Sequence, residues 1–210
     1  MNTNADLLLQ KLKNRLINPL PGSISHQRML PPGRTLQHPS EQGHYHESAV
    51  LILLFPSEGQ LYICLIRRPT TMKNHAGQIA FPGGRKEKDD KDLIYTALRE
   101  AEEEIGLGRE SAEILGLLSP VYVQVSDFLI TPVVGWMAHI PKIRMDSREV
   151  DEVIYISLEA LTDPANLCER EKETLTGRIA VPGYEIDGNF IWGATAMMLA
   201  ELVELFEDQL

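Results

Sequence analysis

The chain has 210 residues, of which 43% are hydrophobic, and a formal net charge of −10 at pH 7. This composition suits one compact core, and the negative charge argues against nucleic acid or an anionic membrane as a partner, because both attract basic surfaces. Cys64 and Cys168 are the only cysteines, too few and too far apart for a zinc site or a disulfide framework. We find no signal peptide and no run of about 18 apolar residues, so we expect a soluble, cytoplasmic protein.

The first predicted elements form an N-terminal segment. Leucines at helical spacing predict a helix over residues 5–16, which the following prolines end. Residues 23–47, rich in His, Pro, Gly and Gln, are predicted to form a long connection. We therefore expect an N-terminal helix and extended arm over residues 1–45, and one larger domain over residues 46–210.

The larger domain is predicted to mix strands and helices. Apolar or alternating runs predict strands over residues 48–55, 60–67, 112–118, 128–140 and 150–156, and two short strands joined by Asp187 and Gly188. Helical patterns cover residues 93–105, a turn near residues 157–161, and a final helix from Gly193. Strands flanked by two substantial helices predict an α/β fold, in which a mixed β-sheet lies between helices.

Four glutamates lie close together on the helix predicted over residues 93–105. At about 100° per residue, Glu100, Glu103 and Glu104 share one arc of about 100°, whereas Glu102 points away. Carboxylates that converge at the rim of a buried helix face suit a hard divalent cation such as Mg²⁺ or Mn²⁺. We therefore predict a metal site at the three converging glutamates, and a solvated side chain for Glu102.

Cationic side chains precede this helix. Between Arg67 and Lys91, lysines and arginines outnumber the acidic residues. A local excess of positive charge beside a metal site is the pattern that an anionic phosphate substrate requires.

The stretch from Gly84 to Leu107 resembles the signature box of the Nudix hydrolases, G-x5-E-x7-R-E-U-x-E-E-x-G-U, where U is an aliphatic or small apolar residue. The last nine positions of the box, from Arg99 onward, are matched in full. Upstream, Asp90 stands where the box has Glu, and one additional residue separates it from Arg99, which leaves the role of Asp90 open. The resemblance implies the α/β Nudix fold and a divalent metal cofactor.

The positions of the box suggest roles for its charged residues. Glu100 and Glu104 are one helical turn apart and match the family's usual metal ligands. Glu103 is either a further metal ligand or the base that accepts a proton from the attacking water. Arg99 precedes Glu103 by four residues, so we expect an ion pair that orients it.

A second stretch, residues 65–84, resembles the signature of the coenzyme A pyrophosphatase branch, L-L-T-x-R-[SA]-x3-R-x3-G-x3-F-P-G-G. Lys73 stands where this signature has an arginine, and a lysine cannot bind a phosphate in a bidentate manner. The glycine pair is predicted to let backbone approach a phosphate or a metal. The candidate substrate-binding residues are Arg67, Arg68, Lys73, Gly83 and Gly84.

Four other residues have two interpretations each. Glu149 and Glu152 are expected to be solvated, with the catalytic base as the alternative, because some Nudix enzymes supply a base from such a loop. His75 is expected to make structural hydrogen bonds rather than to catalyse. Trp192 is expected to pack in the core, with adenine stacking as the alternative.

The two resemblances imply a metal-dependent Nudix diphosphatase. The expected reaction is cleavage of coenzyme A or acyl-coenzyme A to 4′-phosphopantetheine, or its acyl form, and adenosine 3′,5′-bisphosphate. One alternative is a hydrolase of ADP-ribose or another nucleoside-diphosphate derivative, and another is a non-catalytic Nudix module that senses a nucleotide. The expected partner is a small molecule; the sequence leaves the oligomeric state open, a homodimer included.

Overall fold

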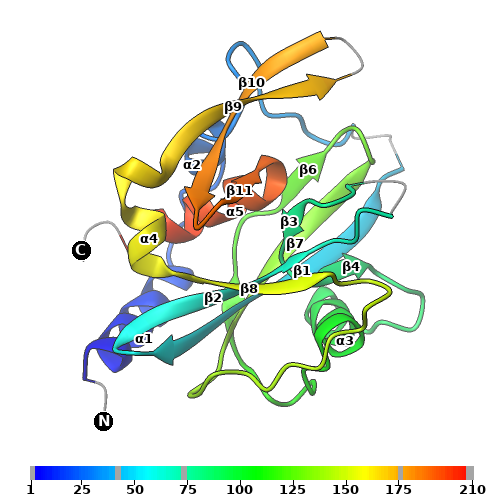
Figure 1. Ribbon diagram of the computed structural model, residues 1–210. Coiled ribbons are helices and arrows are strands. Elements are labelled where there is room, and N and C mark those ends of the chain that lie inside the picture. Colours follow the sequence, from blue (N-terminus) through cyan, green and yellow to red (C-terminus); the bar gives the residue numbers. More distant parts are fainter. Residues whose placement is uncertain (1–2, 41–43, 72–74, 175–176, 207–210) are drawn as a thin grey trace.

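The computed structural model describes residues 3–40, 44–71, 75–174 and 177–206. Its helices and strands are, in chain order, α1 (Thr3–Leu16), α2 (Ser23–Gln27), β1 (His46–Ser57), β2 (Gln60–Arg67), β3 (Ile79–Ala80), β4 (Gly83–Arg85), α3 (Leu93–Ile105), β5 (Glu113–Leu117), β6 (Val121–Val123), β7 (Phe128–Trp136), β8 (Glu152–Ser157), α4 (Leu158–Thr162), the 3₁₀ helix η1 (Pro164–Asn166), β9 (Leu167–Thr174), β10 (Gly177–Ile186), β11 (Asn189–Trp192) and α5 (Gly193–Glu204) (Figure 1). Among the described residues, no helix is long and apolar enough to cross a membrane.

The main sheet of the described chain has eight strands around the central pair β1 and β7. Its order is β3-β2-β1-β7-β5, while β4 pairs with β1, β6 with β7 and β8 with β2. β1 and β7 are parallel and the other pairs are antiparallel, so the sheet is mixed, as predicted. The first part of β1 pairs with β4, where Val50 lies opposite Gly83. The glycine pair of β4 therefore lies beside the central strand.

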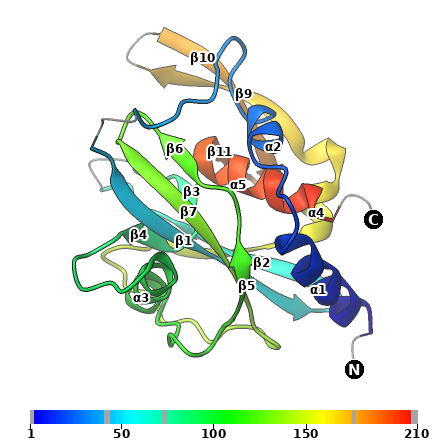
Figure 2. The ribbon, with the colours of Figure 1, turned by 180° about the vertical axis from the view of Figure 1, so that it is seen from behind.

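Helices cover both faces of this sheet. Alternate side chains of β1 point to opposite faces: Ile52 and Leu54 belong to a buried cluster with α5, whereas Leu51 and Leu53 belong to a second cluster with α3. Figures 1 and 2 show α3 and α5 on opposite sides of the sheet. The predicted α/β architecture, a mixed sheet between helices, is confirmed.

A second, three-stranded sheet was only partly predicted. The turn at Asp187 and Gly188 is present between β10 and β11, but β10 also pairs along its length with β9, which the sequence does not predict. β9 alternates glutamate with arginine or lysine from Glu169 to Glu173 and lacks the apolar side chains by which strands were recognised. Strand pairing in this hairpin therefore depends on the partner strand rather than on a hydrophobic pattern.

The prediction of a long connection over residues 23–47 was wrong at its start, where α2 forms. The fully buried Glu201 of α5 holds this segment: it accepts a hydrogen bond of 3.1 Å from the backbone N–H of Gly22, and its Oε2 lies 2.9 Å from Nε2 of His26. The second contact joins residues 175 positions apart in the chain. No local sequence pattern could have indicated so distant an anchor.

Candidate active site

The acidic helix α3 has well-defined ends. At its start, the Asp92 side chain accepts a hydrogen bond of 2.7 Å from the backbone N–H of Tyr95. At its end, Gly106 adopts the left-handed conformation that glycine tolerates without strain. The buried alanines of α3 pack against β1, which fixes the rotation of the helix. That rotation determines which glutamates are buried.

The two glycines of strand β4, Gly83 and Gly84, place their backbone against Glu104 and Glu100. A side chain at Gly83 would overlap the carbonyl oxygen of Ala49. A side chain at Gly84 would overlap the carboxylate of Glu100. The backbone N–H of Gly83 donates a hydrogen bond of 2.8 Å to Oε2 of Glu104. The sequence predicts that these glycines let backbone approach a phosphate or a metal; in the structure Gly83 makes room for the backbone of β1 and Gly84 makes room for the Glu100 carboxylate.

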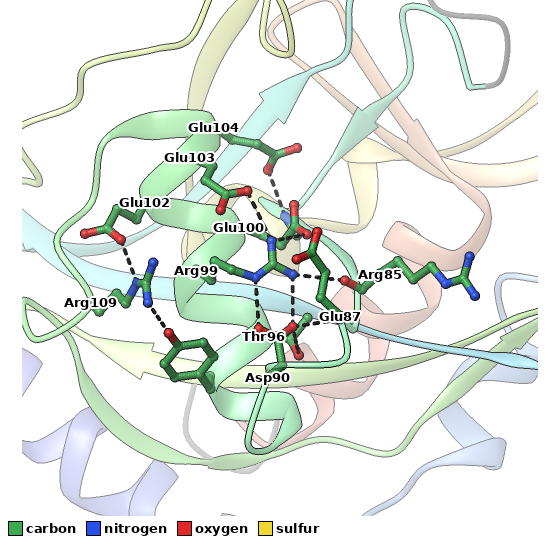
Figure 3. A network of polar contacts seen from close by, with 12 residues as sticks. Arg85, Glu87, Asp90, Thr96, Arg99, Glu100, Glu102, Glu103, Glu104 and Arg109 are labelled. Carbon is green, nitrogen blue, oxygen red and sulfur yellow. Dashed lines mark hydrogen bonds and ion pairs between the residues drawn. The ribbon is translucent and has the colours of Figure 1, made fainter.

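Glu100 and Glu104 lie one turn apart on the protected side of α3 (Figure 3), with side chains 14% and 3% exposed. Burial raises the pKa of Glu104 to about 8, although the Gly83 N–H and the charge of Arg68 act in the opposite direction. Burial also raises the pKa of Glu100, opposed by its ion pair with Arg99. The charge of Glu100 raises the pKa of Glu104 further. A bound cation would stabilise both carboxylates in their charged form.

The donor set of this pair fits a hard divalent cation, because both side chains offer carboxylate oxygens. Within the described residues, no group of three or more His, Cys, Asp or Glu side chains is close enough to hold a metal ion. Glu100 and Glu104 are close enough for their charges to interact, and both lie against the backbone of β4, so these two carboxylates would hold the ion.

The third predicted ligand, Glu103, lies beside Glu100 but is more exposed. Its side chain is 52% exposed and forms an ion pair of 3.1 Å with Nη1 of Arg99, four residues earlier (Figure 3). The ion pair is present, as predicted. The same Nη1 of Arg99 also contacts Oε1 of Glu100 at 2.8 Å, so the carboxylates of Glu100 and Glu103 lie next to each other, and the role of Glu103 as a metal ligand stays a prediction. Glu102 is exposed, as predicted, and pairs with Arg109 at 2.6 Å.

Asp90, whose role the sequence leaves open, fixes Arg99. Its two carboxylate oxygens accept hydrogen bonds of 3.0 Å each from Nε and Nη2 of Arg99. A further bond of 2.9 Å comes from the Thr96 hydroxyl. The Arg99 guanidinium holds the pKa of Asp90 at about 2, below its ordinary 3.8. Arg99 also pairs with Glu100 at 2.8 Å, so Asp90 positions a carboxylate of the site through Arg99.

The cationic residues before the glycine pair have different partners. Arg67 forms an ion pair of 3.0 Å with Glu152 and donates a hydrogen bond to Asn189. Arg68 lies nearer the buried carboxylates, with Nη1 3.9 Å from Oε1 of Glu104. Its Nε is buried and has no hydrogen-bond partner among the described residues. Lys73 lies outside the described residues.

The two late-loop glutamates differ in their surroundings. Glu152 forms an ion pair with Arg67. Glu149 is exposed, and its charge contributes to the raised pKa of both Glu100 and Glu104. Of the two residues considered from sequence as an alternative base, Glu149 therefore acts on the carboxylate pair directly.

His75 and Trp192 complete the set of predicted residues. His75 Nδ1 lies 3.0 Å from Oε1 of Gln78, which fits the predicted structural hydrogen bond. Trp192 is only half-buried, so the prediction that it packs in the core was wrong. Its neighbour Ile191 points into the core instead, because successive strand residues face opposite sides.

Comparison with known proteins identifies the family. Residues 45–176 match the family model described as the NUDIX domain. The chain belongs to the Nudix family. A relative from Pectobacterium atrosepticum, named uncharacterized Nudix hydrolase NudL, is 36% identical over 188 residues, covering 87% of this chain and 92% of the relative. A NudL protein from Yersinia pestis is 35% identical over 182 residues, covering 85% of this chain and 89% of the relative.

Two solved structures resemble this chain in their fold. The Nudix hydrolase RenU from M. smegmatis has a TM-score of 0.54 at 18% identity, covering 82% of this chain and 94% of that one. The MutT protein from Methanosarcina mazei Go1 has a TM-score of 0.53 at 17% identity, covering 81% of this chain and 100% of that one. These two likenesses show the fold alone. The family and its hydrolase relatives establish an enzyme that acts on diphosphates.

The pair formed by Asp90 and Arg99 predicts an effect on stability at acidic pH. Asp90→Asn should lower the free energy of unfolding at pH 7 by about 2 kcal/mol, because a buried charge-assisted pair is lost. Asp90 has a lower pKa in the folded chain than its ordinary 3.8, so its contribution is present above about pH 4 and is lost as the pH falls toward about 2. Urea denaturation of both proteins from pH 7 to pH 2 measures this difference.

The exposed neighbour provides the control for that experiment. Asp89→Asn removes a carboxylate one position earlier and should change stability little at any pH. A difference between wild type and Asp90→Asn that stays constant down to pH 2 would contradict the depressed pKa of Asp90.

Proposed function

We propose that this Nudix hydrolase is metal-dependent and cleaves coenzyme A or acyl-coenzyme A to 4′-phosphopantetheine, or its acyl form, and adenosine 3′,5′-bisphosphate. One observation carries the catalytic part: the buried carboxylates of Glu100 and Glu104 lie against the Gly83 and Gly84 backbone, with Arg68 beside them. The substrate rests on the resemblance of residues 65–84 to the coenzyme A signature. A cytoplasmic location is part of the same proposal.

Glu100 and Glu104 would hold Mg²⁺ or Mn²⁺, and members of the family generally use divalent metal ions. When bound, such an ion neutralises phosphate oxygens and lowers the pKa of a coordinated water. Arg99 is a positioning residue in this scheme, because Asp90 fixes it and it pairs with Glu100 at 2.8 Å. Gly83 positions Glu104 through its backbone N–H.

Hydrolysis requires a proton acceptor near the carboxylate pair. The oxygen of a water attacks one phosphorus, the bond from that phosphorus to the bridging oxygen breaks, and the other phosphate leaves with the electron pair. The proton of the attacking water passes to a carboxylate. Glu149 suits this role better than Glu103, because its charge acts on both Glu100 and Glu104, whereas Glu103, which also acts on Glu100, is paired with Arg99.

Arg68 is the candidate contact for a substrate phosphate. Its Nε lacks a partner among the described residues, and its nearest carboxylate oxygen, on Glu104, is 3.9 Å away. A guanidinium with free donors can bind a phosphate oxygen through charge-assisted hydrogen bonds. Arg67 has fewer free donors, because Glu152 and Asn189 already accept from it.

Removing one carboxylate of the buried pair tests the metal assignment. Glu104→Gln should reduce kcat by orders of magnitude at saturating Mg²⁺, because the metal loses a charged ligand. The fold should tolerate this change, since burial already favours the neutral form of Glu104. Steady-state kinetics with circular dichroism measures both effects. Glu102→Gln, on the exposed side of the same helix, is the matched control; near-normal turnover by folded Glu104→Gln would refute the assignment.

A substrate panel tests the proposed substrate together with Arg68. Wild type is assayed with coenzyme A, 3′-dephospho-coenzyme A and ADP-ribose in Mg²⁺ and in Mn²⁺, with products resolved by chromatography. Arg68→Ala should lower kcat/KM for coenzyme A by roughly one to two orders of magnitude, the value of one charge-assisted bond. Arg67→Ala should have a smaller effect, because its guanidinium is already engaged.

The outcomes separate the alternatives. Wild-type preference for ADP-ribose, with little effect of Arg68→Ala on coenzyme A cleavage, would replace the coenzyme A proposal by the ADP-ribose alternative. Nucleotide binding without hydrolysis of any compound would indicate the sensing module instead.

A further inference from the structure

The loop before β8 is anchored on two elements of the candidate active site. Figure 1 shows this loop, in yellow-green, running beside α3 before it enters β8. The backbone N–H of Asp146 donates a hydrogen bond of 2.9 Å to the carbonyl of Glu104, on α3. The backbone N–H of Asp151 donates a hydrogen bond of 2.9 Å to the carbonyl of Arg67, at the end of β2. The loop therefore bridges the helix that carries the carboxylate pair and the strand that leads to Arg68.

Between these anchors, Asp146 begins one tight turn. Its carbonyl accepts hydrogen bonds from the backbone N–H groups of Glu149, at 3.0 Å, and of Val150, at 2.9 Å. Cα atoms three residues apart across such a turn are within about 7 Å of each other, so Glu149 lies close to the anchor at Glu104. Val150 is buried in the cluster that packs on α3. The turn thus holds the exposed Glu149 at a fixed place, from which its charge reaches the carboxylate pair.

The Asp146 side chain holds both the turn and the arginine within it. Its Oδ1 accepts a hydrogen bond of 2.9 Å from the backbone N–H of Arg148, a pattern by which aspartate stabilises turns. Both carboxylate oxygens also accept from the Arg148 guanidinium, Oδ1 at 3.0 Å from Nε and Oδ2 at 2.5 Å from Nη2. Arg148 holds the pKa of Asp146 at about 2, below its ordinary 3.8. The Arg148 side chain is otherwise 84% exposed, so Asp146 is what fixes it within the described chain.

Arg148 is also the neighbour of Glu149. Hydrogen bonds with Asp146 raise the pKa of Arg148, and the charge of Glu149 raises it further, so this charge reaches the guanidinium. Even so, no arginine or lysine of the described residues forms an ion pair with Glu149, whereas Glu103 is paired with Arg99. An ion pair favours the charged form of a carboxylate and makes it a weaker acceptor of a proton. By engaging Arg148, Asp146 leaves the Glu149 carboxylate free to accept one.

We propose that Asp146 is a positioning residue for the hydrolysis: it holds the turn and keeps Arg148 off Glu149, so that Glu149 can take the proton of the attacking water. This inference rests on the proposed role of Glu149 and does not depend on which diphosphate is cleaved. It gives Asp146 no contact with substrate or metal. Loss of the Asp146 charge would release Arg148 to pair with Glu149, one position away.

A double-mutant cycle tests this inference on the compound of the substrate panel that wild type cleaves fastest. Asp146→Asn removes the charge but keeps an oxygen that can accept from the Arg148 N–H, so the turn should persist. At saturating Mg²⁺, kcat should fall about tenfold while KM changes little, because the proton acceptor is weakened and substrate binding is not. The double variant Asp146→Asn/Arg148→Gln should recover most of this loss, since the released arginine is gone. Arg148→Gln alone should stay near wild type.

Three further variants complete the experiment. Glu149→Gln should lose at least as much activity as Asp146→Asn, because it removes the proton acceptor itself. Glu102→Gln is the matched control: it releases Arg109 from an ion pair of 2.6 Å on the exposed side of α3 and should keep the wild-type rate. Asp146→Ser, whose hydroxyl can accept the same bond from the backbone, replaces Asp146→Asn if circular dichroism shows that the latter does not fold.

The remaining outcomes count against the inference. A wild-type rate for Asp146→Asn would mean that Arg148 does not reach Glu149, and a loss that persists in the double variant would mean that Asp146 acts on loop structure alone. If Glu149→Gln keeps the wild-type rate, the proposed proton acceptor is wrong and the inference falls with it. If the cycle behaves as expected on ADP-ribose while coenzyme A is not cleaved, only the proposed substrate is wrong.

Discussion

Two carboxylates are held out of water at the point where the backbone of β4 meets helix α3. Burial raises the pKa of Glu104 to about 8, and the Gly83 N–H and Arg68 only partly offset that cost. Position 83 must also lack a side chain to lie against β1, and position 84 must lack one to leave room for the Glu100 carboxylate. The hydrophobic packing of α3 on the central sheet therefore maintains an arrangement that is electrostatically incomplete in the protein alone. An arrangement of this kind is common at functional sites, because the ligand supplies the missing charge.

A second set of contacts keeps this arrangement rigid. Arg99 is buried, and the two hydrogen bonds that it donates to Asp90 leave its guanidinium a single orientation. In that orientation its Nη1 contacts both Glu100, at 2.8 Å, and Glu103, at 3.1 Å. One arginine thus holds the two carboxylates next to each other: the Glu100 side chain is 14% exposed and the Glu103 side chain is 52% exposed.

The sequence predicted the elements whose signals are local. The β1–β2 hairpin, α3 and α5 follow from apolar periodicity, and the pairing of Arg99 with Glu103 follows from helical spacing. The contact of Glu201 with His26 could not be predicted, because its partners are 175 positions apart. β9 was missed because its charged residues carry no hydrophobic pattern.

In the candidate site, too, the features with a local sequence signal were predicted and those that depend on contacts between separate segments were not. The spacing of Glu100 and Glu104 indicated one shared direction, and both side chains are protected from solvent. The partner of Asp90 was not predicted, because the additional residue before Arg99 shifts it out of the family pattern and only the folded loop brings the two together. A helical wheel also places Glu103 beside Glu100, where both contact Nη1 of Arg99, but it could not show that Glu103 is the more exposed of the two. The roles of these residues in catalysis stay predictions.

Direct metal binding is the measurement closest to the central claim, since it needs no substrate. Electron paramagnetic resonance of free Mn²⁺ during titration should show that wild type and Glu102→Gln bind the ion equally, whereas Glu100→Gln and Glu104→Gln bind it at least tenfold more weakly, a loss of about 1.4 kcal/mol. Equal Mn²⁺ affinity in all four proteins would contradict the claim that the buried pair is built to hold a divalent cation.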